Sequence, residues 1–101
     1  MQPQGHLQLI SNLLDRGMSP QEAIDAPRFC IPSGKANGGV VLEDGLQREA
    51  EHLAALGHAD VRVATGVGRS VFGRAQIIQR LASGVLVGGS DGRGDGCAIG
   101  Y

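Results

Sequence analysis

A helix, its start and its end are all predicted by the stretch Met18-Ser19-Pro20-Gln21-Glu22-Ala23-Ile24-Asp25-Ala26-Pro27-Arg28-Phe29. Ser19-Pro20-Gln21-Glu22 has the spacing of a capping box, in which the serine and glutamate side chains each accept from the other residue's backbone N–H. The proline of this box suits the first helical position, where no N–H donor is needed. Pro27 disfavours helical backbone at the residue before it, so the helix is predicted to end there after about two turns.

A longer amphipathic helix is predicted upstream, from about Gly5 to Arg16. Gly17 follows this segment and suits the left-handed residue that commonly ends a helix. Apolar residues recur in the segment at helical spacing, and they are Leu7, Ile10, Leu13 and Leu14. The stripe that they form must pack against another part of the fold.

Downstream of the quoted stretch, strands are predicted on both sides of a third helix. Residues 29–31 are extended in character, residues 32–39 form a loop by their turn residues, and residues 40–43 read Val-Val-Leu-Glu, which favours a strand. Apolar residues at helical spacing then predict a helix from about residue 46 that ends at Gly57. Alternation of Val61 and Val63 with other residues predicts a half-buried strand.

The last third of the chain is rich in glycine and is predicted to contain a β-hairpin. Residues 75–81 fit either a helix or a strand, but Ala82-Ser83-Gly84 followed by Val85-Leu86-Val87 favours the hairpin. Residues 66–71 fall short of a dinucleotide-binding glycine pattern and are predicted to be a flexible connection. Helices followed by strands around a third helix indicate an α+β fold, and no repeat or linker divides the chain.

Composition excludes several classes of partner. The net charge is −1, with nine basic and ten acidic residues interspersed, so neither a nucleic acid nor an anionic membrane is expected to bind. The chain contains neither a signal peptide nor an apolar run of spanning length, and a cytoplasmic location is the default expectation. Cys30 and Cys97 could form one bridge, although two small buried thiols are the preferred interpretation.

Ser90 is the most conspicuous candidate nucleophile, because Gly88-Gly89-Ser90-Asp91-Gly92 matches the G-x-S-x-G pattern of hydrolases. That pattern requires a strand before the serine, a helix after it and a histidine base. Only nine residues follow Gly92, they are glycine-rich, and no histidine occurs after His58. An ordinary turn is therefore the favoured interpretation.

Asp91, Arg93 and Asp95 have a spacing that superficially resembles a calcium loop. Arg93 would occupy a liganding position, and the chain ends before the glutamate that such a loop needs. We predict instead that these three side chains bond to one another and to turn backbone, as a structural network. The three histidines lack metal-ligand spacing, so neither a metal site nor a cofactor is expected.

Three stretches, residues 1–8, 18–29 and 88–101, resemble in this order and spacing the C-terminal part of the small subunit of γ-glutamyltransferases, also called γ-glutamyltranspeptidases. The resemblance implies a partial αββα sandwich of the N-terminal nucleophile hydrolase type, with two N-terminal helices, one middle helix and several antiparallel strands. It implies that residues 1–101 form a single incomplete domain. The intact enzyme would transfer or hydrolyse γ-glutamyl groups of glutathione-like donors.

The same resemblance implies that this chain lacks the catalytic residues. In that family a threonine at the start of the small subunit attacks, and its own α-amine acts as the base. The single threonine here, Thr65, lies in mid-chain and cannot combine the two roles. No residue is expected to catalyse or to bind substrate, and Met1 and Gln2 would lie next to an oxyanion loop that precedes them. The chain alone is expected to be inactive.

The expected partner is the remainder of the precursor or its large subunit, and a γ-glutamyl substrate would bind only to the intact enzyme. Either a natural truncation or a reading frame started too late would produce such a chain. Two alternatives stay open: a non-catalytic scaffold or interaction protein derived from this fold, and a small hydrolase that uses Ser90.

Overall fold

A computed structural model describes residues 1–101, which divide into two compact units. Unit 1 contains Met1–Gly5 and Pro27–Gly73, and unit 2 contains His6–Ala26 and Arg74–Tyr101. Each unit is described by itself below. None of the helices combines the length and the apolar character that a bilayer crossing demands. The mixed α+β class predicted from the sequence is confirmed.

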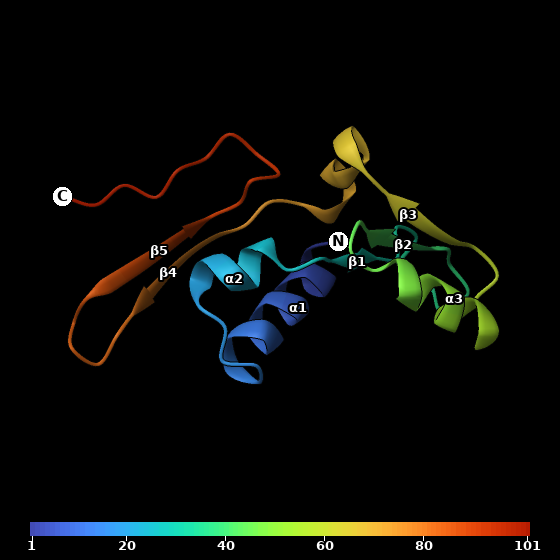
Figure 1. Ribbon diagram of the computed structural model, residues 1–101, viewed down its shortest axis with the longest axis horizontal. Helices are drawn as coiled ribbons and strands as arrows, with labels where there is room; N and C mark the ends of the chain where they lie inside the picture. The colour runs from blue at the N-terminus through green and yellow to red at the C-terminus, as the bar shows by residue number, and fades with distance from the viewer. The chain divides into compact units, whose positions relative to one another are not determined.

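Unit 1 is built on a three-stranded sheet of β1 (Phe29–Cys30), β2 (Val40–Glu43) and β3 (Val61–Ala64), in that order (Figure 1). β1 and β2 pair antiparallel, as expected. β2 and β3 pair in parallel, so the prediction of antiparallel strands was wrong for this pair. The reason is the connection between them, α3 (Gln47–Ala55), because a helical crossover returns the chain in the same direction.

The segment predicted to be a flexible connection is ordered instead as a 3₁₀ helix, η1 (Gly66–Phe72). Gly66 and Gly73 bound it with positive φ angles, which a residue without Cβ adopts at little cost. Bonds between residues three apart, such as the 3.0 Å bond from the Gly68 N–H to the Thr65 carbonyl, are those of a 3₁₀ turn. Phe72 at its end is fully buried. This aromatic anchor explains why the segment is fixed.

Unit 2 contains most of α1 (Gln2–Leu14), together with α2 (Pro20–Asp25) and a hairpin of β4 (Gln76–Arg80) and β5 (Leu86–Ser90). The hairpin prediction is confirmed, with antiparallel pairing along both strands. α1 starts at Gln2 rather than near Gly5, because its first helical bond already joins residues 5 and 1. It also ends two residues before the predicted end, where the Met18 N–H returns to the Asn12 carbonyl.

α2 has both predicted ends. The Ser19 hydroxyl accepts from the Glu22 N–H at 3.3 Å, and the Glu22 carboxylate accepts from the Ser19 N–H at 2.8 Å. The helix ends at Asp25, just before Pro27. The capping box also lowers the pKa of the Glu22 carboxyl below its ordinary value of 4.5, because the Ser19 backbone N–H and hydroxyl bond the ionised form.

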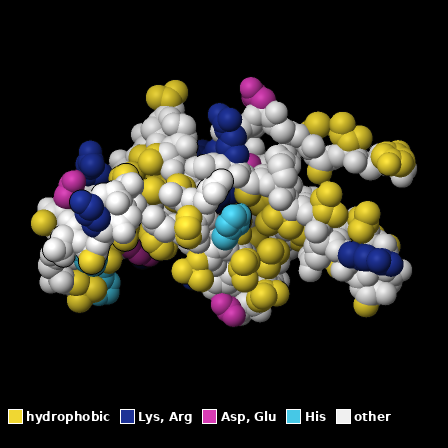
Figure 2. Space-filling model, turned by 180° about the vertical axis from the view of Figure 1, so that it is seen from behind, with side chains coloured by type: hydrophobic (Ala, Val, Ile, Leu, Met, Phe, Trp, Pro, Cys, Tyr) yellow, Lys and Arg dark blue, Asp and Glu magenta, His cyan; other side chains and the backbone are white.

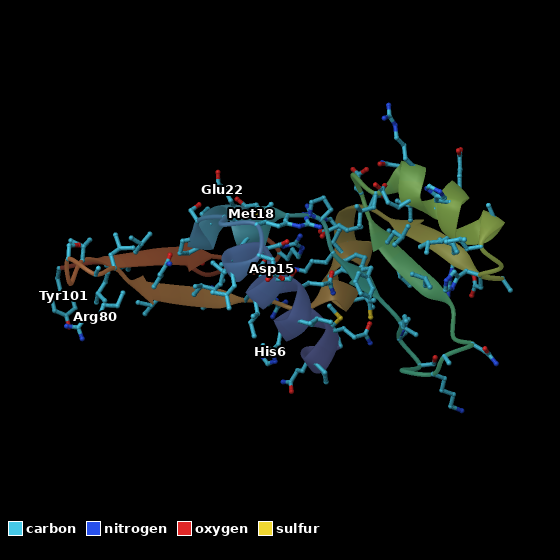
Figure 3. All side chains as sticks on the ribbon, turned by 90° about the horizontal axis from the view of Figure 1, so that it is seen from below. His6, Asp15, Met18, Glu22, Arg80 and Tyr101 are labelled. Atoms are coloured by element: carbon cyan, nitrogen blue, oxygen red, sulfur yellow. The ribbon has the colours of Figure 1, made fainter.

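One face of the hairpin packs on α2. Gly89 is buried there, and a Cβ at this position would lie 2.9 Å from the Pro20 carbonyl carbon and 3.0 Å from the Ile24 Cδ1. The opposite face carries Ile78 and Leu86, which are exposed. The tail after β5 turns back along the hairpin, and Tyr101 ends near the same end of the unit as Arg80 (Figure 3).

Candidate functional site

The first turn of α1 is fixed within unit 1 by the side chain of Gln4. Its Oε1 accepts from the Ile31 N–H at 2.8 Å, and its Nε2 donates to the Ile31 carbonyl at 3.1 Å. A side-chain amide here pairs with a backbone amide as a neighbouring strand would. Met1 is half-buried and Gln2 is exposed beside this anchored turn. Met1 and Gln2 therefore lie beside an anchored helical turn.

A buried carboxylate lies at the end of β2 in the same unit. The Glu43 Oε2 accepts from the Arg28 N–H at 3.0 Å, and its Oε1 accepts from the Arg69 Nε at 2.6 Å. Glu43 is buried, whereas Arg69 is partly exposed. The Arg28 guanidinium donates in turn to the carbonyls of Phe72 and Gly73 at the end of η1, at 3.3 and 3.5 Å. This Glu43 cluster joins β1, β2 and η1.

A second polar cluster closes unit 2, and we call it the Arg93 clasp, made by Asp91 and Arg93. The Arg93 Nη1 lies 3.1 Å from the Asp91 Oδ1, and it donates to the Ile24 carbonyl at 2.8 Å. The Asp91 Oδ2 accepts from the Ala75 N–H at 2.9 Å, and the Asp91 Oδ1 from the Arg93 N–H at 3.0 Å. Asp95 is exposed and lies outside the clasp. The geometry is that of a structural tie between the tail, α2 and the start of β4.

Ser90 is held by amides rather than by a base. Its backbone N–H and carbonyl both bond the Gln21 side chain at 3.0 Å, and its hydroxyl accepts from the Gln76 Nε2 at 2.9 Å. Gly96 packs against this hydroxyl so closely that a Cβ there would lie 2.9 Å from it. A general base within hydrogen-bond reach is what a serine nucleophile needs, and the groups bonded to Ser90 are not bases.

The other chemically reactive residues do not assemble into a site. Thr65 is exposed at the start of η1 and makes no side-chain cap there. Cys30 is buried and Cys97 is exposed, and both are free thiols. Burial raises the pKa of the Cys30 thiol above its ordinary value of 9.0. No three His, Cys, Asp or Glu side chains meet in a group that could hold a metal ion.

The sequence did not identify three residues that join distant segments of the chain. Gln4, Gln21 and Glu43 each bond at least one partner that is 15 or more residues away along the chain. One signal was available for Glu43, because a carboxylate that directly follows three apolar strand residues is positioned to be buried. No local pattern marks a glutamine that will bond backbone from a distant segment.

Comparisons with known proteins agree along the whole chain. The family model described as gamma-glutamyltranspeptidase matches residues 1–101. The chain is 36% identical over 102 residues to the glutathione hydrolase-like YwrD proenzyme of Bacillus subtilis (strain 168). This match covers 98% of the chain and 19% of the relative. The chain therefore spans about a fifth of the length of that protein.

Solved structures show the same similarity in three dimensions. A cephalosporin acylase from Bacillus halodurans matches with a TM-score of 0.79 and 38% identity, over 98% of this chain and 18% of that one. A gamma-glutamyltranspeptidase from Pseudomonas nitroreducens, complexed with L-DON, matches with a TM-score of 0.75 over 96% of this chain and 48% of that one. The two sequences are 19% identical, so this similarity supports the fold alone. With the family model matched from end to end, this chain belongs to the gamma-glutamyltranspeptidase family.

Proposed function

We propose that this chain supplies the C-terminal structural part of a γ-glutamyltranspeptidase catalytic domain and that it is inactive alone. The intact protein would transfer or hydrolyse γ-glutamyl groups of glutathione-like donors. Membership of the family and coverage of only about a fifth of a relative support this proposal. Thr65, the single threonine, lies in mid-chain, so the nucleophile that the family resemblance implies must come from another segment.

The observation that carries the proposal is a pair of apolar faces in unit 2 that face solvent. On α1 the residues Leu7, Ile10 and Leu14 are between 53% and 78% exposed, although their spacing puts them on one stripe. On the hairpin Ile78 and Leu86 are 76% and 64% exposed. Figure 2 shows hydrophobic side chains gathered at the surface over α1 and over the hairpin. Stable monomers rarely leave such surfaces uncovered.

The hairpin has the character of an inner layer. Ile77, Val87 and Gly89 alternate with Ile78 and Leu86, so apolar residues line both of its faces. α2 covers only one of these faces. The two exposed apolar side chains on the other face, which they share with Gln76 and Arg80, support a second sheet over Ile78 and Leu86. We therefore propose the αββα sandwich, with residues 1–101 as one incomplete domain of it.

The partner that we propose is the remainder of the precursor or its large subunit. Met1 and Gln2 would then follow the oxyanion loop, and the Gln4 bonds to Ile31 would hold the helix that supports this loop. Asp91 and Arg93 keep a structural role. The γ-glutamyl group would bind only in the assembled protein. A cephalosporin acylase among the relatives makes an acyl-cephalosporin a second substrate class to test.

Complementation tests the proposal directly. The Bacillus subtilis relative, with the segment matched by this chain deleted, is co-expressed with this chain, and hydrolysis of γ-glutamyl-p-nitroanilide and of an acyl-cephalosporin is measured. We expect turnover from the pair and none from either part alone. Ile10→Glu and Ile78→Glu should abolish the recovery, whereas Glu51→Gln, on the exposed side of α3, should not. Turnover by the isolated chain would overturn the proposal.

A further inference from the structure

We propose that Asn37 is a site of spontaneous covalent modification, at which the side-chain amide becomes a carboxylate through a cyclic imide formed with Gly38. Asn37 is exposed in the loop between β1 and β2, and Gly38 follows it directly. The backbone nitrogen of the next residue is the nucleophile in this reaction, and glycine leaves that nitrogen unshielded because it has no Cβ. The proposal is independent of the catalytic function.

The packing of the turn favours glycine at position 38. A Cβ there would lie 2.0 Å from the Ser33 Oγ and 3.0 Å from the Lys35 carbonyl oxygen. The first distance would force the Ser33 hydroxyl to move, and the second is tighter than most contacts that a Cβ makes with backbone. A larger residue that would shield the nitrogen and slow the reaction would have to displace the Ser33 hydroxyl and crowd the Lys35 carbonyl. The loop combines an exposed amide with the neighbour that makes it most reactive.

The atoms balance with water as the only co-reactant. The Gly38 nitrogen loses its proton and attacks the Asn37 Cγ, so a nitrogen–carbon bond forms while the Cγ–Nδ2 bond breaks and ammonia leaves. Water then opens the five-membered imide at either carbonyl. Attack at Cγ gives aspartate, and attack at the main-chain carbonyl gives isoaspartate, in which the chain continues through Cγ. Each product carries one new negative charge.

One hydrogen bond slows the first step in the folded chain. The Gly38 N–H donates to the Lys35 carbonyl at 2.9 Å, and it must leave this acceptor before it can lose its proton. The Ser33 Oγ accepts from the Lys35 N–H at 3.2 Å and stabilises the same turn. The net worth of one such backbone bond predicts that unfolding speeds the reaction about three- to tenfold.

The new charge would arise beside the start of β2. Gly39 packs so closely on Asp60 that a Cβ there would lie 2.5 Å from its Oδ2, and the Val40 N–H donates to the Asp60 carbonyl at 2.7 Å. An aspartate at position 37 adds a like charge near this junction, and an isoaspartate lengthens the main chain just before it. We expect the isoaspartyl product to loosen the pairing of Val40 with Val61.

Asn12, the other asparagine of the chain, is an internal control. It is buried in α1 and is followed by Leu13. The full chain is incubated at mildly alkaline pH, with and without urea, and digested. Mass spectrometry then follows the change from amide to carboxylate at both positions, with fragmentation to distinguish isoaspartate. We expect Asn37 to convert at least about tenfold faster than Asn12, since the reacting nitrogen after Asn12 lies within a helix.

Two variants separate the chemistry from the turn. Asn37→Gln lengthens the side chain, disfavours the ring and should abolish the product at this position. Ser33→Ala removes the hydroxyl that stabilises the turn and should raise the native rate toward the rate in urea. The proposal fails if Asn37 converts no faster than Asn12. It also fails if the native and urea rates are equal, since the turn would then have no influence.

Discussion

Arg93 and Asp91 form an ion pair from which water is excluded, with the Arg93 Nη1 3.1 Å from the Asp91 Oδ1 and the side chains only 2% and 0% exposed. The same guanidinium donates to the carbonyls of Ile24 and Ala26, at 2.8 and 3.3 Å. These carbonyls lie at the C-terminal end of α2, where backbone acceptors have no partner within the helix. A cation suits this end of the helix dipole.

Arg93→Ala should therefore destabilise unit 2 strongly. The substitution leaves the Asp91 carboxylate buried without its cation, and the Ile24 carbonyl loses the group that donates to it. We therefore expect a loss of about 3–5 kcal/mol in the free energy of unfolding. Urea denaturation followed by circular dichroism measures it. Arg80→Ala is the control, because Arg80 is exposed on β4 and should change stability by less than about 0.5 kcal/mol. Equal effects of the two variants would contradict the clasp.

Gly89→Ala should push α2 away from the hairpin. The added methyl would lie 2.9–3.0 Å from atoms of Pro20, Gln21 and Ile24, and we expect a cost of about 1–3 kcal/mol from overpacking. Gly92→Ala is the matched control, because nothing lies within 4 Å of a Cβ there. Thermal melting of both variants distinguishes them. A Gly89→Ala protein as stable as Gly92→Ala would show that this packing is looser than described.

Glu43→Gln should weaken unit 1. The amide carries one acceptor oxygen where the carboxylate used two, and its NH₂ would face either the Arg28 N–H or the Arg69 guanidinium. We expect a loss of about 1–3 kcal/mol, toward the lower end because Arg69 is partly solvated. Glu51→Gln on exposed α3 serves as the comparison in the same denaturation experiment. A neutral result for Glu43→Gln would mean that the Glu43 cluster does not hold β2 and η1 together.

Cys30 should make the protein less stable in alkali. Burial raises the pKa of its thiol, so the unfolded chain loses this proton at a lower pH than the folded chain. The stability that comes from the buried, protonated thiol is fully present below the ordinary pKa of 9.0. It is lost as the pH rises through the higher pKa of the folded chain. Cys30→Ala should flatten this part of the stability curve. Iodoacetamide should label exposed Cys97 well before Cys30, and labelling of both at one rate would refute the burial.

Ser90→Ala should leave the turnover of the complemented enzyme unchanged. Its hydroxyl accepts from the Gln76 amide, and we expect only the loss of that hydrogen bond, about 1 kcal/mol or less for a partly exposed pair. Steady-state kinetics with γ-glutamyl-p-nitroanilide measure the effect. A large fall in kcat with an unchanged melting temperature would instead favour Ser90 as a nucleophile.

Elements that are fixed by interactions between near neighbours in the sequence could be predicted. Elements that depend on distant contacts could not. α2 could be predicted residue by residue, because its cap joins Ser19 to Glu22 and its end is imposed by Pro27. The hairpin followed from Ala82-Ser83-Gly84 and the Val85-Leu86-Val87 that comes after it. The parallel pairing of β2 with β3 was missed because strand direction depends on the crossover by α3, not on the strands' own residues.

The same limit applied to the candidate site. The contact of Asp91 with Arg93 was expected because the two residues are neighbours in one turn. The carbonyl of Ile24, which Arg93 also binds, is 69 residues away, and nothing in a glycine-rich tail indicates which distant carbonyls an arginine will reach. η1 was missed because its order depends on burial of Phe72, and burial is a property of the assembled unit.

The division of the chain into interleaved segments has a consequence for how it is made. Unit 2 needs both His6–Ala26 and Arg74–Tyr101, so a ribosome must release residues 74–101 before α2 can meet the hairpin. Contacts closed over such long loops form slowly. During synthesis the face of α2 that packs on Gly89 therefore stays uncovered until the hairpin emerges, and losing the last dozen residues would remove the arginine that ties the two segments together.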